Sequence, residues 1–445
     1  MEHVVIIGGI AGGMSAASKL RRLDKTVKIS VFEKDEYVSY GACGLPYYIS
    51  GVTESHEDLL ARTVKEFEER DIEVHIHHEV TKVDALNKRV KVKNLQSGEE
   101  TYVNYDKLLI STGAKPILPP FIPKEASNVH TLKTLNDGIQ MRKFYKDERI
   151  KKVGIIGGGY IGMELVETMV ELGKEVFVIE LQNHILPNYD EDMAKIISES
   201  LQDRVGIRTG EEVKELKMSE GKVTSIVTDK DSYEVDAVIV NIGIKPNTDF
   251  IKELGLDMLE NGALIVNSHQ ETSIQSIYAA GDCATSNHLL LNKPVNIALG
   301  TTANKHGRVV ADNLAGIPST FDGILGTNVV KILEWTAAMT GITEKQAEQE
   351  NLDVEKVVIE TNNHASYYPG AENIHIKLVY EKESLKLLGA QLIGKDESIA
   401  KRLDVYATAI TCGLTTRQIA MLDLCYAPPY ATVWDAVQIA ANAAK

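Results

Sequence analysis

Residues 153–173 read VGIIGGGYIGMELVETMVELG and decide the fold. A short apolar run leads into a glycine cluster and then a helical pattern, the order of a buried parallel strand, a tight turn and a helix. Gly157, Gly159 and Gly162 spell GxGxxG. The first glycine permits the turn, the second admits a pyrophosphate to the backbone, and the third lets the helix pack on the strand. The strand EVFVIE follows and ends at Glu180, which completes a βαβ unit.

The same order of elements opens the chain. Residues 3–23 read HVVIIGGIAGGMSAASKLRRL, and the next strand, KISVFEK, reaches Glu33. Gly8 and Gly13 occupy the first and last glycine positions of the motif. Ile10 replaces the middle glycine, and Gly12 is an additional glycine. Two such openings predict two dinucleotide-binding domains, with Glu33 and Glu180 accepting hydrogen bonds from ribose hydroxyls. Because no Arg or Lys closely follows Glu180, and a carboxylate repels a 2′-phosphate, we expect NADH rather than NADPH on the second loop.

Composition excludes several classes of protein. The 445 residues carry a formal net charge of -15, which disfavours nucleic acid and anionic membranes as partners. No apolar run is long enough to span a bilayer, and no signal peptide is visible, so we expect a cytoplasmic protein. The four cysteines form no CxxC pair, so neither a disulfide scaffold nor a metal site is expected. Three of them are interpreted as small packing residues: Cys283, Cys412 and Cys425.

The remaining segments predict an α/β chain with two Rossmann-like domains and a C-terminal α+β domain. Buried strands ending in glycine turns recur at 105–116, 235–247 and 272–284, whereas after about residue 320 alternating strands and amphipathic helices take over. The predicted boundaries are 1–115 with 245–320 for the first dinucleotide domain, 116–150 for a connecting segment, 151–244 for the second dinucleotide domain and 321–445 for the last domain.

The segment 272–284, TSIQSIYAAGDCA, ends in Gly-Asp and completes a family pattern. With the two glycine loops, it resembles the FAD-dependent pyridine nucleotide-disulfide oxidoreductases over nearly the whole chain. The resemblance implies FAD on the first loop, with Asp282 on the ribityl chain, and NAD(P)H on the second, with Tyr160 and Glu164 near the nicotinamide. The implied FAD residues are Gly8, Gly12, Gly13, Glu33, Lys34, Val80, Thr112, Gly113, Asp282 and Ala298. The implied NAD(P)H residues are Gly157, Gly159, Tyr160, Ile161, Gly162, Glu164, Glu180 and Gly243.

One cysteine lies where this family performs its chemistry. Cys43, in SYGACGLPYYISG, follows the Glu33 strand, and the resemblance places it at a helix start beside the flavin, where a thiol pKa falls. The disulfide reductases of the family carry Cys-x4-Cys here, but this segment of the chain has Cys43 alone and no second cysteine nearby. A lone cysteine must cycle through a sulfenic acid or a mixed disulfide. Oxidases and peroxidases of this branch usually have a histidine at the position of Ala11, so the chain looks most like the coenzyme A-disulfide reductases.

The resemblance also implies a coenzyme A site and a shared active site. Ser15, Lys19 and Arg22 share a helix face, and the two cations suit phosphates. The other implied substrate residues are Ser39, Ala42 and Arg62. Tyrosines of the last domain, Tyr367 (or its neighbour Tyr368) and Tyr426, are expected to reach the cysteine of a second subunit, which would make the enzyme an obligate homodimer.

These features predict reduction of coenzyme A disulfide, coenzyme A persulfide or polysulfide through a mixed disulfide on Cys43. An NADH oxidase that reduces O2 through a Cys43 sulfenic acid is the first alternative. A redox-sensing binding protein, which would use its cofactors to set an interaction state, is the second.

Overall fold

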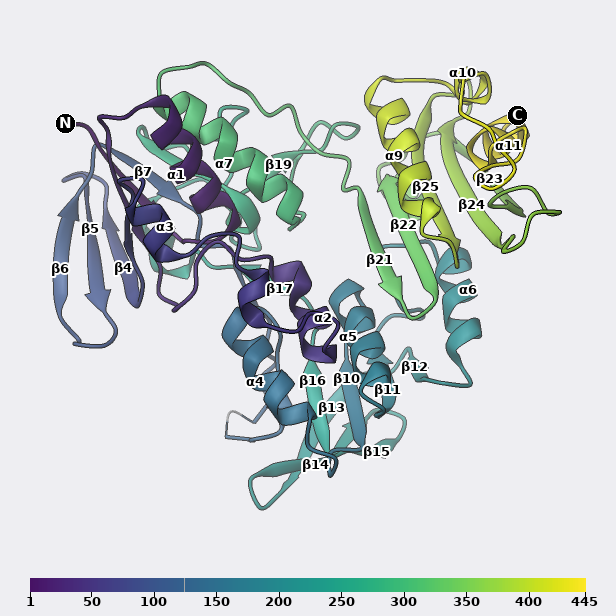
Figure 1. The fold of residues 1–445 in the computed structure, drawn as a ribbon, viewed down its shortest axis with the longest axis horizontal. Coiled ribbons are helices and arrows are strands. Elements are labelled where there is room, and N and C mark those ends of the chain that lie inside the picture. Colours follow the sequence, from purple (N-terminus) through teal and green to yellow (C-terminus); the bar gives the residue numbers. More distant parts are fainter. Residues whose placement is uncertain (124) are drawn as a thin grey trace. The chain divides into compact units, whose positions relative to one another are not determined.

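A computed structural model describes residues 1–123 and 125–445 (Figure 1). The chain forms two compact units, each built from separate stretches of sequence. Unit 1 comprises Met1–Ile117, Leu132–Phe144 and Gly243–Ile324. Unit 2 comprises Leu118–Thr131, Tyr145–Ile242 and Leu325–Lys445. The connecting segment predicted at 116–150 is divided between the units, and its Lys124 lies outside the described residues.

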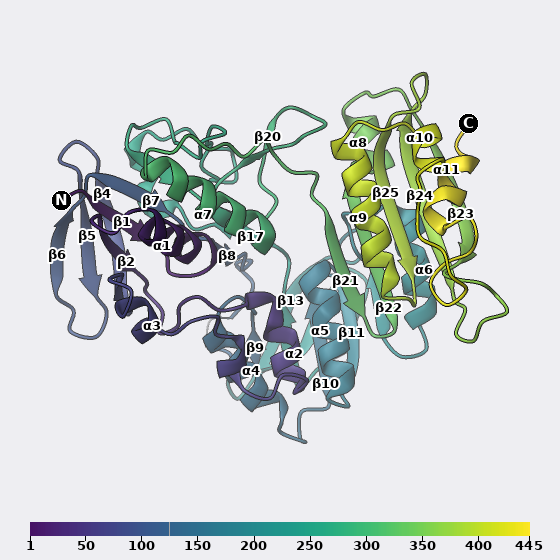
Figure 2. The same ribbon diagram turned by 45° about the horizontal axis from the view of Figure 1, so that its top comes forward.

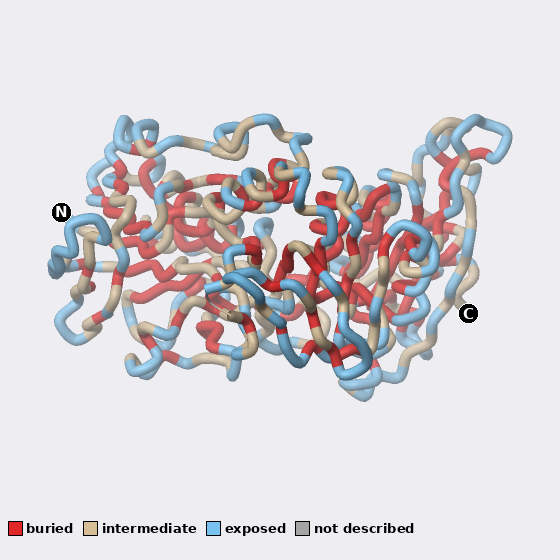
Figure 3. Tube along the Cα trace, turned by 90° about the horizontal axis from the view of Figure 1, so that it is seen from below, coloured by how far each residue is buried: buried red, intermediate tan, exposed pale blue. Residues whose placement is uncertain are grey.

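A parallel five-stranded sheet forms the centre of unit 1, in the order β18-β7-β1-β2-β3. Alternate residues of β1 enter two different cores, Val4 and Ile6 facing helices α1 and α7 while Val5 and Ile7 face strands β4 and β5. Because both faces are covered, β1, β7 and β18 are almost entirely apolar, and Figure 3 draws buried segments of the chain in red. The bounds are β18 (Ile277–Ala279), β7 (Lys107–Ile110), β1 (His3–Ile7), β2 (Lys28–Phe32), β3 (Glu73–His75), α1 (Ala11–Leu23) and α7 (Gly300–Leu314).

Smaller elements complete unit 1. The sheet β4-β5-β6 is antiparallel, and two further strand pairs form short ribbons. Their bounds are β4 (His78–Asp84), β5 (Arg89–Asn94), β6 (Glu100–Asn104), β8 (Ala114–Pro116), β17 (Ile244–Pro246), β19 (Ser286–Asn287) and β20 (Pro294–Val295). The remaining helices are α2 (Leu45–Ser50), α3 (Val64–Glu68) and α4 (Leu135–Tyr145), of which α4 runs into unit 2 at its last residue.

Unit 2 contains a second parallel sheet, in the order β12-β11-β10-β16-β9. Apolar residues of β10 and β16 face the antiparallel sheet β13-β14-β15, while α5 packs on β10 and β11. The strand bounds are β12 (Gly206–Thr209), β11 (Glu175–Glu180), β10 (Lys152–Ile156), β16 (Ala237–Val240), β9 (Val129–His130), β13 (Val213–Ser219), β14 (Lys222–Thr228) and β15 (Ser232–Glu234). The helices are α5 (Tyr160–Glu171) and α6 (Glu191–Leu201).

The C-terminal part of unit 2 is an antiparallel sheet, β21-β22-β25-β24-β23, with helices packed on it. Helix α9 packs on β22 and β25, and α11 packs on β23 and β24 (Figure 2). The strand bounds are β21 (Asn328–Ile332), β22 (Trp335–Gly341), β23 (Val354–Asn362), β24 (Asn373–Glu381) and β25 (Leu387–Gly394). The helices are α8 (Glu344–Gln349), α9 (Ser398–Thr411), α10 (Thr416–Ala420) and α11 (Ala436–Ala443). The predicted fold class is confirmed.

A buried lysine joins the two parts of unit 2. Lys377 on β24 is 1 % exposed, and its ammonium lies 3.2 Å from Asp190, 2.9 Å from Asp192 and 2.8 Å from Glu344. The Asp190 carboxylate also accepts hydrogen bonds from the Gln391 side chain and from the first backbone amides of α8. A buried charge is tolerated when opposite charges and hydrogen bonds surround it. These contacts therefore fix the second parallel-sheet segment to the antiparallel sheet.

Within the described part of the chain, no helix has the length and apolarity that crossing a bilayer requires.

Candidate active site

The first glycine loop follows β1 and leads into α1. Gly8 has φ +105°, and a Cβ there would lie 2.1 Å from the Ser111 carbonyl oxygen; a Cβ on Gly13 would lie 2.0 Å from the Gly8 oxygen. Glycine is therefore required at both positions. No side chain among the described residues caps α1. Its first backbone N–H groups remain available to an anion such as a pyrophosphate.

A buried carboxylate lies beside this loop, at the end of β2. Glu33 Oε2 accepts a hydrogen bond from the Gly9 amide at 2.7 Å, and Oε1 accepts one from the Asp35 amide at 3.0 Å. Burial raises the pKa of Glu33 above its ordinary value. Of the other residues predicted here, Lys34 is exposed, whereas Val80 is a residue of β4 and is buried in the core. The loop and the carboxylate fit the phosphates and ribose of a dinucleotide.

The predicted FAD site also includes the turns after β7 and β18, which begin beside the first glycine loop. Thr112 donates to the Asn247 carbonyl at 2.8 Å, and Gly113 adopts φ +65° with open space around it. Asp282 lies in a short 3-10 turn and forms an ion pair with Lys133 at 2.9 Å. Sequence reasoning missed Lys133, which stands in no motif. Ala298 is half-buried just before α7.

The second glycine loop repeats the backbone of the first in unit 2. Gly157 has φ +102°, and a Cβ on Gly162 would lie 2.1 Å from the Gly157 oxygen. Glu180 accepts hydrogen bonds from the Gly158 amide at 2.7 Å and the Gln182 amide at 2.8 Å. At Gly159, by contrast, no described atom lies within 4 Å of a built Cβ, so a ligand can approach the backbone closely. The residues present therefore fit a dinucleotide.

Tyr160 and Glu164 begin helix α5, as the sequence predicts, and Ile161 lies between them. The Tyr160 hydroxyl donates to the Met339 sulfur at 3.4 Å, and its ring meets Tyr189 edge-on. Burial raises the pKa of Tyr160 to about 12. Burial, with a smaller contribution from Glu167, raises the pKa of Glu164 to about 7. Gly243, also predicted for this site, has φ +120° and belongs to unit 1.

A hollow of about 570 Å³ begins directly after Glu180 in unit 2. Its lining includes Gln182, Asn183 and His184, together with four lysines from other elements: Lys195, Lys345, Lys356 and Lys377. No sequence signal predicted that these lysines would line one hollow with Gln182, Asn183 and His184. Lys356 and Lys377 are paired with Glu344, so their charges are largely compensated.

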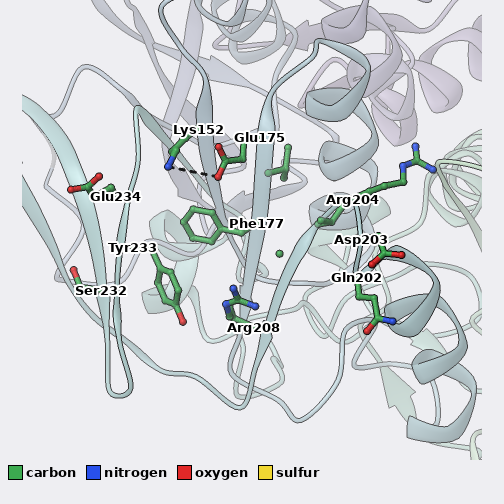
Figure 4. Close-up of a pocket in the computed structure, with 13 residues that line it drawn as sticks. Lys152, Glu175, Phe177, Gln202, Asp203, Arg204, Arg208, Ser232, Tyr233 and Glu234 are labelled. Carbon is green, nitrogen blue, oxygen red and sulfur yellow. Dashed lines mark ion pairs between the residues drawn. The ribbon is translucent and has the colours of Figure 1, made fainter.

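A second hollow, of about 450 Å³, lies where β10, β11 and β12 begin (Figure 4). It is therefore at the edge of the sheet opposite the glycine loop. Lys152 and Glu175 on its wall are 3.7 Å apart, and Arg204 pairs with Glu334 at 2.7 Å. Its lining contains none of the residues predicted for the site, and we assign no ligand to it.

Cys43 lies in a 3-10 turn, Ala42–Gly44, which runs directly into α2. The Cys43 side chain is exposed. Its segment is joined to the first glycine loop, because the Ser39 amide donates to the Gly9 carbonyl at 2.8 Å. The Tyr48 ring on α2 lies 4.4 Å from the Arg142 guanidinium. An accessible thiol is thus held on the same unit as the first loop.

The three remaining cysteines do not share one environment. Cys283 is buried and its thiol faces two backbone carbonyls, which confirms a packing role. Cys412 and Cys425 are exposed, so their interpretation as buried packing residues is wrong. Cys412 caps the C-terminal end of α9, where the helix reaches the surface of unit 2.

The residues predicted for coenzyme A lie mainly along α1. Ser15 donates to Asn304 of α7 at 2.6 Å, and Lys19 forms an ion pair with Asp312 of α7 at 2.5 Å. Arg22 is exposed one turn further along α1. The α7 partners carried no sequence signal that could have predicted them. In the Cys43 segment, Ser39 adopts φ +51° and Ala42 is half-buried, as is Arg62 further along.

Two of the predicted tyrosines contact each other on unit 2. A hydrogen bond between the Tyr426 hydroxyl and Tyr367 raises the pKa of Tyr426. Tyr367 is 76 % exposed and Tyr426 46 % exposed. Tyr368 instead meets His364 edge-on, at a centroid distance of 5.6 Å. The structure therefore pairs Tyr367, rather than Tyr368, with Tyr426.

Comparison with known proteins agrees with this geometry. The family description "Pyridine nucleotide-disulphide oxidoreductase" matches residues 2–307, and its dimerisation domain matches residues 327–437. The chain belongs to this family. FAD and NAD(P)H are typical of the family, and the dimerisation domain indicates a homodimer.

Relatives of similar length carry different names. An "NAD(P)H sulfur oxidoreductase (CoA-dependent)" of Pyrococcus abyssi is 37 % identical over 100 % of this chain and 98 % of its own length. A "Coenzyme A disulfide reductase" of Staphylococcus haemolyticus is 33 % identical over 99 % of this chain and 98 % of its own length. An "NADH oxidase" of Enterococcus faecalis is 33 % identical, with 99 % of each covered.

Among solved structures, a NAD-dependent persulfide reductase from A. fulgidus superimposes with a TM-score of 0.95 at 37 % identity. The match covers 99 % of this chain and 82 % of that chain. The fold and the oxidoreductase class are thereby shown.

Proposed function

We propose that this oxidoreductase uses FAD and NAD(P)H to reduce coenzyme A disulfide, or coenzyme A persulfide or polysulfide, through Cys43. The observation that carries the proposal is the exposed Cys43 thiol, held beside the first glycine loop without a second cysteine in its segment. FAD, when bound, would relay an electron pair from NADH to this thiol site. In this proposal residues 1–115 with 245–320 form the FAD domain, and residues 151–244 form the NAD(P)H domain.

The chain's own residues would hold the two cofactors. The first backbone amides of α1 and α5 would face the pyrophosphates, because no described side chain caps either helix. Glu33 and Glu180 would each orient a ribose. Both carboxylates are already fixed by two backbone amides, so little ordering is needed when a ligand binds.

Cys43 would carry out the thiol exchange. Its thiolate attacks one sulfur of coenzyme A disulfide, forming a Cys43–S–S–CoA bond while the S–S bond of the substrate breaks and one coenzyme A thiolate leaves. Two electrons and a proton then cleave the mixed disulfide. The second coenzyme A thiol leaves and the Cys43 thiolate is regenerated.

Coenzyme A would bind along α1, with its phosphates near Lys19 and Arg22. Lys19 is held by Asp312, so a phosphate would share or displace that carboxylate, whereas Arg22 is exposed and accessible. Ser15, Ser39, Ala42 and Arg62 complete the proposed contacts.

The pair Tyr367–Tyr426 would serve the cysteine of a second subunit. The family's dimerisation domain supports a homodimer, and the two exposed phenols are already hydrogen-bonded to each other. In an active site shared between subunits, one phenol could hydrogen-bond the thiolate or protonate a departing thiol.

The mass of the intact, unreduced protein tests this function. We expect an adduct of one coenzyme A per chain, released by dithiothreitol and missing in Cys43→Ser. Coenzyme A disulfide turnover should disappear in the same variant. An unmodified chain that also fails to reduce coenzyme A disulfide would refute the proposal.

An NADH oxidase is the second candidate, since a relative of that name matches over 99 % of the chain and the Cys43 thiol is accessible. Ala11 argues against the histidine-assisted form of that reaction. Oxygen uptake and thiol release, measured on one preparation with the same NADH supply, distinguish the two. Oxygen uptake that exceeds thiol release by roughly tenfold would favour the oxidase.

A further inference from the structure

A buried histidine lies behind the turn that carries Asp282. His306, in the middle of α7, is fully buried, and its ring meets Phe321 edge-on at a centroid distance of 5.0 Å. The next residue, Gly307, packs on α1, where a Cβ would lie 2.2 Å from the Gly12 oxygen. Close helix packing therefore fixes the position of the His306 ring.

Both nitrogens of the ring have partners. The Gly281 backbone amide donates to Nδ1 at 3.4 Å, and Nε2 lies 3.0 Å from the Ser286 hydroxyl oxygen. Because an amide N–H can only donate, Nδ1 must be the acceptor and the proton must lie on Nε2. Burial lowers the pKa of His306 to about 4, which agrees with a neutral ring.

The ring holds the backbone at the start of the Gly281–Cys283 turn. Gly281 adopts φ +80°, and a Cβ there would lie 3.4 Å from Ala303 of α7. From the other side, Asn296 donates to the carbonyls of Asp282 and Ala284, each at 3.0 Å. The turn is thus fixed through its N–H by His306 and through its carbonyls by Asn296.

We propose that His306 is a positioning residue for FAD, which fixes the Gly281–Cys283 turn so that the Asp282 carboxylate faces the ribityl chain. The inference rests on the proposed function, in which unit 1 binds FAD. The imidazole does not contact the cofactor in this proposal; it acts through the Gly281 amide.

Three histidine variants test the proposal, with the dissociation constant of FAD for apo-protein measured by flavin fluorescence. His306→Leu removes both hydrogen bonds and should weaken FAD binding roughly tenfold. His306→Asn keeps an acceptor near the position of Nδ1 and should restore affinity to within about threefold of wild type. The control is His288→Leu. His288 is also buried in unit 1, and its Nδ1 accepts hydrogen bonds from the backbone amides of Leu290 and Leu291. It should lower the melting temperature without changing FAD affinity.

Equal weakening of FAD binding by His306→Leu and His288→Leu, or no recovery in His306→Asn, would overturn the inference. If His306→Leu does not fold, Ser286→Ala takes its place, because it removes only the hydrogen-bond partner of Nε2. This variant should weaken FAD binding roughly threefold. Unchanged FAD affinity would contradict the proposal. The visible spectrum of bound FAD should shift in His306→Leu but not in His288→Leu. A wild-type chain that binds no FAD would refute the proposed function itself.

Discussion

The two glycine loops share one backbone and differ in what surrounds them. In the first, described atoms crowd the glycines: a Cβ on Gly9 would lie 2.8 Å from Val38, and one on Gly12 would lie 2.6 Å from Ser111. In the second, Gly157 and Gly162 are as crowded as Gly8 and Gly13, but Gly159, whose counterpart in the first loop is Ile10, meets no described atom within 4 Å of a built Cβ. The second loop therefore leaves its backbone accessible at a position where the first carries a side chain. We propose that this difference goes with FAD on the first loop and NAD(P)H on the second.

The strongest test of these roles removes the thiol that both would serve. Cys43→Ser should lower disulfide turnover by at least about a thousandfold, because a hydroxyl is a far weaker nucleophile than a thiolate. Reduction of the flavin by NADH should persist, since neither loop is altered. Thiol release and flavin absorbance in stopped flow measure the two steps; simultaneous loss of both would mean that the serine damages the first site.

A matched pair of glycine substitutions compares a crowded position beside the first loop with the open position in the second loop. Gly307→Ala places a Cβ 2.2 Å from the Gly12 oxygen, so α1 and α7 must separate. We expect a loss of about 1–3 kcal/mol in the free energy of unfolding, together with weaker FAD binding. Gly159→Ala meets no described atom, so it should leave the melting temperature unchanged and weaken only NADH. Calorimetry gives the melting temperature of each variant, and titration gives its affinity for each cofactor. Similar melting temperatures for the two variants would contradict the comparison.

The carboxylate after the second loop should set the choice between nicotinamide cofactors. Glu180→Ala removes an acceptor for the ribose hydroxyls, and we expect NADH binding to weaken roughly tenfold. NADPH should lose less, because the carboxylate no longer repels its 2′-phosphate. Dissociation constants for both cofactors provide the check; a larger loss for NADPH would reverse the assigned preference.

Glu164 offers a pH-dependent test within the second site. Its pKa of about 7 exceeds the ordinary glutamate value of 4.5, so the native state binds a proton more tightly than the unfolded state does. The wild-type protein should therefore lose stability as the pH rises through about 4.5 to 7, by roughly 1–3 kcal/mol. Glu164→Gln should lack this contribution. Melting temperatures of the wild-type protein and of Glu164→Gln, measured from pH 5 to 8, test this contribution. If the two melting temperatures change with pH in parallel, Glu164 makes no such contribution.

A further test concerns the outer face of α1. Replacing Lys19 and Arg22 together with alanine should raise the KM for coenzyme A disulfide roughly tenfold through lost phosphate contacts. Asp312→Asn should lower that KM slightly, because it releases the Lys19 ammonium from its partner. A small uncharged disulfide serves as the control substrate. Equal changes for both substrates would place the effect outside phosphate recognition.

The features of the fold that depend on local sequence patterns could be predicted from the sequence. Both βαβ units, the carboxylates that end β2 and β11, and the antiparallel C-terminal sheet follow from glycine spacing and hydrophobic periodicity. Side-chain pairing was not predictable, because partners distant in the chain meet only through the topology. Lys19 and Asp312 are 293 residues apart, and Lys133 and Asp282 are 149 apart.

The lysine enclosed by Asp190, Asp192 and Glu344 limits how this chain could exchange parts with its relatives. A recombinant that took residues 151–244 from another protein would keep Lys377 but could lose two of its carboxylates. The buried ammonium would then keep Glu344 as its one remaining partner among these three carboxylates, which compensates its charge less well. Inheritance of residues 151–244 is thus tied to that of the C-terminal sheet, and a viable chimera must carry both sides of the contact.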